Sequence, residues 1–207
     1  MKCGAVIVAY GDPARREAGY AIAAWRLHNR EPVVVVSDRP LDVYGAQFVK
    51  FTEPGPLARW AKLHVDRLVP KSWESFVYLD ADTRAQGSLR AGFDIIADGW
   101  DVAITASTKQ GCDSMWHIGR DERRATWEET GNPFLLQLQG GLMFVRQCMQ
   151  TCGLFEAWRD EWGRWRDKDQ AALLRALHRV PVKLWLLGRP WNGGALVRHR
   201  YGQARGE

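Results

Sequence analysis

Two aspartates stand directly after a short apolar stretch and could hold a metal ion together. Residues 76–79 are Phe, Val, Tyr and Leu, and Asp80 and Asp82 follow with one alanine between them. In an extended chain, residues i and i+2 face the same side, so both carboxylates could converge on one hard cation. Mg²⁺ and Mn²⁺ accept such oxygen ligands together with water and substrate phosphates. A plain turn is the alternative interpretation, because aspartate is also common in turns.

The elements around this pair predict where it lies in the fold. Apolar, β-branched runs alternate with amphipathic segments, as in an α/β fold with parallel strands. The predicted strands are 5–9, 33–36, 46–51, 76–79 and 102–105, and the predicted helices begin at Pro13 and span 56–69. Ligands of open α/β sheets bind outside the carboxyl ends of the strands. The aspartate pair is therefore expected at the ligand-binding edge of the sheet.

The second half of the chain begins with a segment that has no clear pattern. Residues 107–135 are too long for a plain connection, so a lid or substrate-facing insertion is expected there. Trp116 and His117 in this segment could line an acceptor site.

Regular patterns return after the insertion. Helices are predicted over 152–165 and 169–178, and a strand over 182–187. The first helix carries an aromatic stripe that we interpret as core packing rather than a sugar platform: Phe155, Trp158, Trp162 and Trp165. No repeat or linker interrupts the chain, which predicts a single domain.

Composition and charge bound the class of protein. The chain has 207 residues, 46% hydrophobic and 26% charged, which excludes a disordered or fibrous protein. The net charge of +5 suits an anionic ligand, but the basic residues are dispersed, so a nucleic-acid partner is not expected. No apolar run reaches the roughly 18 residues of a transmembrane segment, and no signal peptide is evident. We therefore expect a cytoplasmic protein.

The cysteines indicate a reducing environment. Cys3, Cys112, Cys148 and Cys152 show no C-x-x-C spacing. We interpret them as buried, reduced thiols.

Several short motifs occur in an order typical of one known family. They are A-V-I-V-A-Y-G-D, Y-L-D-A-D-T, L-Q-G-G-L-M-F-V, D-Q-A-A-L-L-R-A-L, R-P-W-N-G-G and V-R-H-R. Together they resemble the nucleotide-sugar glycosyltransferases of the GT-A fold, most nearly the glycogenin and galactosyltransferase-like group of family 8 type. The resemblance implies a mixed, mainly parallel central sheet flanked by helices. It also implies a nucleotide-binding half at 1–106, a variable insertion at 107–135 and a donor-sugar and acceptor half at 136–207.

The resemblance implies a role for each matched residue. A divalent metal, Mn²⁺ or Mg²⁺, would be held by Asp80, Asp82 and His199, and the imidazole favours Mn²⁺. Residues at strand ends, a basic helix position and two glycines would bind the nucleotide and the donor: Ala9, Tyr10, Asp38, Lys62, Gly140 and Gly141. Two ligands of the metal and two contacts to sugar hydroxyls would be catalytic: Asp80, Asp82, Asp169 and Gln139. Asp169 could instead be a helix N-cap.

The chain departs from the family pattern at two places. Gln139 stands where the family has an asparagine, so the identity of the donor sugar cannot be carried over. The family's C-terminal H-x-x-G-x-x-K-P-W ending is missing, which removes a phosphate-binding lysine; Arg198 or Arg200 could substitute.

The resemblance predicts an enzyme that moves a sugar from a nucleotide-diphosphate sugar, a UDP-sugar in particular, to an acceptor hydroxyl with retention of configuration. The alternative is a haloacid-dehalogenase-like phosphatase, because F-V-Y-L-D-A-D-T also fits its D-x-D-x-T motif with Asp80 as nucleophile. Against it, the nucleophile normally follows the first strand, whereas earlier strands precede Asp80. A nucleotidyltransferase would need a Gly-rich basic loop after the first strand, and a non-enzymatic nucleic-acid-binding module would need clustered basic residues. Neither feature is present.

Overall fold

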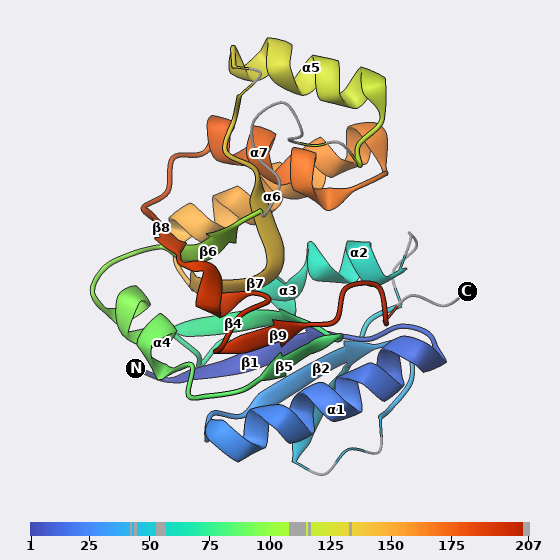
Figure 1. Cartoon of the computed structure of the whole chain (residues 1–207), viewed down its shortest axis with the longest axis vertical. Helices are drawn as coiled ribbons and strands as arrows, with labels where there is room; N and C mark the ends of the chain where they lie inside the picture. The colour runs from blue at the N-terminus through green and yellow to red at the C-terminus, as the bar shows by residue number, and fades with distance from the viewer. Residues whose placement is uncertain are drawn as a thin grey trace.

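The computed structural model describes residues 1–41, 43, 45–52, 57–107, 115, 117–132 and 134–204. Within these residues, seven strands form one sheet in the order β3-β2-β1-β4-β7-β6-β8 (Figure 1). The strands are β1 (Cys3–Val8), β2 (Val33–Ser37), β3 (Ala46–Lys50), β4 (Ser75–Asp80), β6 (Val102–Ala106), β7 (Leu138–Arg146) and β8 (Leu184–Leu187). Strand β7 runs antiparallel to β4 and β6, and the other neighbours are parallel. The predicted mixed, mainly parallel α/β sheet is confirmed.

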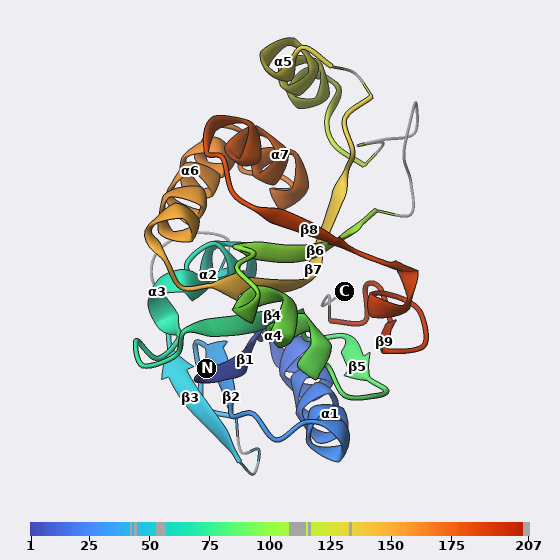
Figure 2. The same ribbon diagram turned by 90° about the vertical axis from the view of Figure 1, so that its left-hand side faces the viewer.

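Helices cover both faces of this sheet (Figure 2). One face carries α1 (Asp12–His28) and α4 (Arg90–Ala97); the other carries α2 (Leu57–Lys62), α3 (Val65–Leu68), α6 (Met149–Trp165) and α7 (Asp169–Arg179). In β1, Ala5 and Ile7 pack toward the first set, whereas Val6 and Val8 pack toward the second. Successive strand side chains point to opposite faces, so a strand buried on both faces must be apolar throughout.

Several elements differ from the sequence expectation. The helix predicted over 56–69 is divided into α2 and α3, with a turn between Lys62 and Val65. Helix α4 and the short strand β5 (Thr83–Ala85) were not predicted. Helix α6 begins at Met149, earlier than expected, where Cys148 and Thr151 form a capping box.

The aromatic stripe of α6 is core for three of its four members. Phe155, Trp158 and Trp162 are buried on the face that packs against the sheet. Trp165, in the last turn of the helix, is 37% exposed. The indole nitrogens of Trp158 and Trp162 donate to the carbonyls of Asp169 and Asp167, so the stripe also holds the start of α7 in place.

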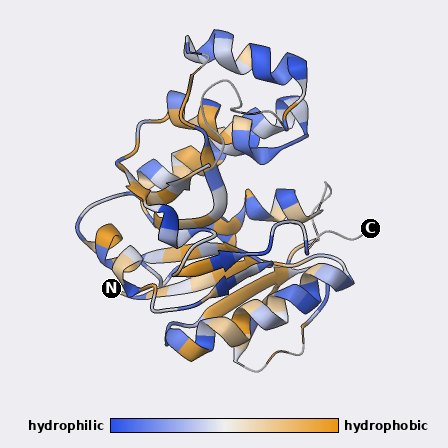
Figure 3. Cartoon of the chain, in the orientation of Figure 1, coloured by the Kyte–Doolittle hydropathy of each residue, from blue (hydrophilic) through white to orange (hydrophobic). Residues whose placement is uncertain are grey.

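The predicted insertion contains a helix that the sequence pattern did not reveal. Helix α5 (Arg120–Thr130) lies beyond α7 at the end of the molecule opposite α1, and its surface is largely hydrophilic (Figures 1 and 3). The buried Arg175 of α7 donates to Thr126 Oγ1 at 2.6 Å and to Glu122 Oε1 at 3.0 Å. It also donates to Glu161 Oε2 of α6 at 2.9 Å. A buried ionic network thus docks α5, in place of the usual apolar stripe.

Among the described residues, every helix is too short or too polar to cross a bilayer.

Candidate functional site

Strand pairing brings the aspartate pair and a distant histidine together. Asp80 ends β4, Asp82 follows in the turn, and β5 begins at once. Strand β5 pairs antiparallel with β9 (Val197–His199), and Thr83 lies opposite His199 in this register. The Nε2 atom of His199 therefore lies 3.1 Å from Asp82 Oδ1 and 3.7 Å from Asp80 Oδ2. One ligand atom from each of the three residues lies within 4.8 Å of the other two, as the metal-site prediction requires.

The histidine is oriented by a second set of contacts. Its Nδ1 lies 2.8 Å from Asn192 Oδ1, and Asn192 Nδ2 donates to Thr105 Oγ1 at 3.2 Å. Asn192 thus fixes the imidazole through Nδ1, and Nε2 faces the two carboxylates, which is the arrangement of a metal-ligating imidazole held by an outer partner. Two carboxylates and one imidazole fit a divalent cation such as Mn²⁺.

Neighbouring groups hold Asp82 in its ionised form and orient Asp80. Burial alone would raise the pKa of Asp82, but its hydrogen bond to His199, the charge of that histidine and the Gly202 amide outweigh burial, so the pKa is lowered. The Gly202 amide donates to Asp82 Oδ2 at 2.9 Å. The hydroxyl of Tyr78 donates to Asp80 Oδ1 at 2.8 Å. Asp82 thus keeps the charge that a cation would need, and Tyr78 orients the carboxylate of Asp80.

A buried ion pair lies next to this cluster. Lys62 of α2 places its Nζ 2.6 Å from Asp169 Oδ2 and 4.0 Å from Asp80 Oδ1. Burial would lower the pKa of Lys62, but the charges of Asp169 and Asp80 outweigh it and the pKa is raised. Burial would likewise raise the pKa of Asp169, yet Lys62 lowers it. Asp169 is the first helical residue of α7, and the N-cap is Lys168, so the alternative cap assignment for Asp169 is wrong.

The two glycines of β7 lie between these groups. A Cβ on Gly141 would come 2.5 Å from His199 Cε1 and 2.7 Å from Asp80 Oδ2. A Cβ on Gly140 would come 3.0 Å from Lys62 Nζ. Because Gly140 and Gly141 have no side chains, Lys62, Asp80 and His199 can all lie close to the backbone of β7.

Replacing Gly141 with alanine is expected to lower the free energy of unfolding by about 1–3 kcal/mol and to weaken Mn²⁺ binding, because the new methyl group displaces His199 or Asp80. Urea unfolding and calorimetric titration with Mn²⁺ measure the two effects. Gly163→Ala is the matched control, since a Cβ there meets no atom within 4 Å. Wild-type Mn²⁺ affinity in Gly141→Ala would contradict this placement of the site.

The predicted nucleotide contacts lie at the ends of β1 and β2, on the same edge of the sheet as Asp80. Ala9 is fully buried. The hydroxyl of Tyr10 donates to the Phe51 carbonyl at 2.6 Å, and burial raises the pKa of this phenol. Asp38 accepts from Arg15 Nη1 at 2.7 Å. The Tyr10 hydroxyl is therefore already engaged, whereas Asp38 is oriented by Arg15 and half-exposed.

Gln139, a predicted contact of the donor sugar, lies in a hydrogen-bonded group with Gln137 and Gln170, which were not predicted as site residues. Gln170 Nε2 donates to Gln139 Oε1 at 2.6 Å, and Gln137 Nε2 lies 3.3 Å from Gln170 Oε1. Burial lowers the pKa of His117, and its hydrogen bond to Gln170 opposes that shift. Trp116, the other predicted acceptor contact, lies outside the described residues. Gln170 and Asn192 were missed as site residues although both stand inside the quoted motifs D-Q-A-A-L and R-P-W-N-G-G.

The two arginines that could replace the missing lysine lie in β9, for Arg198, and directly after it, for Arg200. Arg198 lies opposite Arg84 in the pairing with β5. The Nη1 of Arg200 lies 3.5 Å from Glu17 Oε2, and its side chain is 41% exposed. A role of either arginine toward phosphate stays a prediction.

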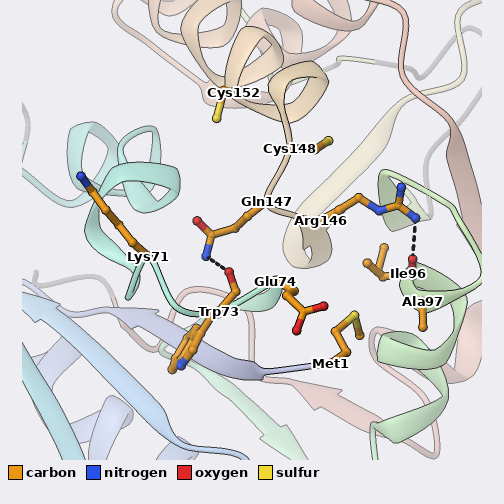
Figure 4. Close-up of a pocket in the computed structure, with 10 residues that line it drawn as sticks. All are labelled: Met1, Lys71, Trp73, Glu74, Ile96, Ala97, Arg146, Gln147, Cys148 and Cys152. Carbon is orange, nitrogen blue, oxygen red and sulfur yellow. Dashed lines mark hydrogen bonds between the residues drawn. The ribbon is translucent and has the colours of Figure 1, made fainter.

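A cavity of about 780 Å³ lies elsewhere, near the start of β4 and the end of β7 (Figure 4). Its lining includes Trp73, Arg146 and Cys148 and none of the predicted site residues. The side chain of Gln147 donates to the Trp73 carbonyl at 2.8 Å there. The candidate metal group found among the described residues, Asp80, Asp82 and His199, lies outside this lining.

The cysteine expectation is corrected in part. Cys3 is buried, Cys148 is half-buried and Cys152 is exposed, and all three are free thiols. Cys152 was expected to be buried, but it is exposed in the first turn of α6. Cys112 lies outside the described residues.

No protein-family model matches the sequence, and no curated protein matches it either. Solved structures do match. The apo form of mouse xyloside xylosyltransferase 1 aligns with a TM-score of 0.66 at 12% identity, over 99% of each chain. The galactosyltransferase LgtC, in complex with donor and acceptor sugar analogs, aligns at 0.64 and 10% identity over 91% of this chain and 74% of LgtC. The bifunctional glycosyltransferase WbbM aligns at 0.61 and 14% identity over 93% of this chain and 40% of WbbM.

At such low identity the likeness concerns the fold alone. The chain has the GT-A fold of these glycosyltransferases, and the fold predicted from the order of the motifs is confirmed.

Proposed function

We propose that this protein is a metal-dependent glycosyltransferase that moves a sugar from a nucleoside-diphosphate sugar, in particular a UDP-sugar, to an acceptor hydroxyl. The observation that carries the proposal is the convergence of Asp80, Asp82 and His199 at the ligand-binding edge of a GT-A sheet. Beside it lies the buried Lys62–Asp169 pair. A cation, a fixed positive charge and a fixed carboxylate at one edge suit a ligand that combines diphosphate with sugar hydroxyls.

Each part of the site has a separate task in this proposal. Asp80, Asp82 and His199 would hold Mn²⁺, which would offset negative charge on the departing diphosphate as a Lewis acid. The lowered pKa of Asp169 keeps its carboxylate ionised, so that it would accept hydrogen bonds from sugar hydroxyls. Lys62 orients this carboxylate. Gln139 would add a second polar contact, and Gly140 and Gly141 would let the donor approach the backbone closely.

The nucleoside would bind along the ends of β1 and β2. Asp38, oriented by Arg15, would accept hydrogen bonds from the ribose hydroxyls. Tyr10 would offer its ring or backbone, because its hydroxyl already donates to Phe51. The resemblance to retaining enzymes favours transfer with retention of configuration. In addition, the sequence shows no positioned base that would favour inversion.

Thermal unfolding with Mn²⁺ and UDP, GDP, CDP or ADP tests the proposal. A ligand that binds only the native state adds about 2.7 kcal/mol of stability at a hundredfold excess over its dissociation constant. We expect one diphosphate to raise the melting temperature in the presence of Mn²⁺ and to lose that effect in a His199→Gln variant. Equal melting temperatures across the panel would contradict the donor site, and hydrolysis of p-nitrophenyl phosphate would then support the phosphatase alternative.

A further inference from the structure

A tyrosine shortly after β9 packs directly on His199. Tyr201 follows β9 by two residues, and its ring stacks on the ring of His199 with centroids 3.9 Å apart and planes 17° apart. The Tyr201 side chain is nevertheless 54% exposed, so packing of the core does not account for its position. The contact is therefore a specific one between an exposed phenol ring and a buried imidazole.

The same short segment also holds a second metal-site residue. The Arg200 amide donates to the Asp82 carbonyl at 2.9 Å, and the Gly202 amide donates to Asp82 Oδ2 at 2.9 Å. Gly202 has φ of 88°, a conformation that side chains disfavour, so the turn that aims this amide depends on glycine. Residues 200–202 thus contact both His199, through the Tyr201 ring, and Asp82, through two backbone amides.

Strand β7 also contacts the imidazole. A Cβ on Gly141 would come 2.5 Å from His199 Cε1, so the backbone of this strand runs close to the ring. The imidazole is therefore contacted by β7 as well as by the Tyr201 ring.

We propose that Tyr201 is a positioning residue for metal binding, which fixes the plane of the His199 ring so that Nε2 faces Asp80 and Asp82. Asn192 holds the edge of the imidazole through one hydrogen bond. Stacking of Tyr201 on the ring face limits tilting of the ring about that bond. The inference rests on the proposed function, because it presumes that the three residues bind a divalent cation.

Calorimetric titration of the EDTA-treated full chain with Mn²⁺ alone tests this role without any assay of transfer. We expect Tyr201→Ala to weaken Mn²⁺ binding about tenfold or more, the effect typical of losing an outer partner of a ligand. Tyr201→Phe keeps the stacked ring and should bind within about threefold of wild type. Leu27→Ala is the control, since Leu27 is 79% exposed and lies on α1. The melting temperatures of all three variants in EDTA should equal that of the wild type.

The possible results separate this inference from the proposal on which it rests. Wild-type affinity in Tyr201→Ala would overturn the positioning role while leaving the metal site intact. Equal losses in Tyr201→Ala and Tyr201→Phe would overturn the stacking argument, because the hydroxyl would then carry the effect. If the wild-type chain bound no Mn²⁺, the metal site and the role of Tyr201 would both be overturned.

Discussion

Replacing Asp82 with asparagine is expected to reduce Mn²⁺-dependent release of nucleoside diphosphate from the donor about a thousandfold. Metal-ion stabilisation of a leaving group contributes several kcal/mol, and each 1.4 kcal/mol is about tenfold in rate. Asp82 is 5% exposed and faces His199 at 3.1 Å, so its charge has no substitute at that position. The asparagine keeps the shape of the side chain, and the fold should survive. Initial rates with and without Mn²⁺, together with circular dichroism, measure both expectations.

A matched variant shows whether the loss belongs to the site. Asp160 is an exposed carboxylate on α6, and Asp160→Asn should retain the full wild-type rate. Normal turnover in Asp82→Asn would instead show that the pair Asp80 and Asp82 does not hold the metal. The proposed function would then lose its principal support.

The parts of the fold that follow from local pattern could be predicted from the sequence. Strands buried on both faces are continuous apolar runs, and β1, β2 and β4 were found at the predicted places. Helix α5 escaped prediction because its stability comes from contacts distant in the chain. The buried Arg175 holds Glu122 and Thr126, and nothing in the helix's own polar sequence reveals that partner.

The site was predictable to the extent that its residues adjoin a strand or match a motif. The position of Asp80 and Asp82 at the end of β4 follows from the apolar run before them. The approach of His199 depends on the pairing of β5 with β9, which no local pattern encodes, and only the family resemblance indicated it. The contacts of Asn192 and Tyr201 with that histidine are side-chain packing, so they became visible only in three dimensions.

The second large effect concerns the Lys62–Asp169 pair. Asp169→Asn is expected to lower the free energy of unfolding by about 3–5 kcal/mol, because the buried ammonium of Lys62 then has Asp80, at 4.0 Å, as its nearest carboxylate among the described residues. Urea unfolding at pH 7 measures the loss. The exposed pair Arg90 and Asp94 is the control, and Asp94→Asn should leave stability unchanged. Equal stability of Asp169→Asn and the wild type would contradict a charged, buried pair.

The pH dependence and a double variant distinguish loss of the pair from loss of packing. The folded pKa of Asp169 is lowered, so its contribution is present above its unfolded pKa of about 3.9 and disappears as pH falls through the folded value. The folded pKa of Lys62 is raised, so its contribution is present below about 10.4 and disappears as pH rises through the folded value. The stability difference between wild type and Asp169→Asn should therefore be largest near neutral pH. It should shrink in acid as Asp169 of the wild type is protonated, and shrink in base as Lys62 of the variant, now without Asp169, loses its proton.

Lys62→Met combined with Asp169→Leu should recover most of the stability at pH 7, because apolar residues of similar volume replace a buried pair at little cost. The same double variant should release no nucleoside diphosphate from the donor, because the pair's charges are needed for the ligand and not for the fold.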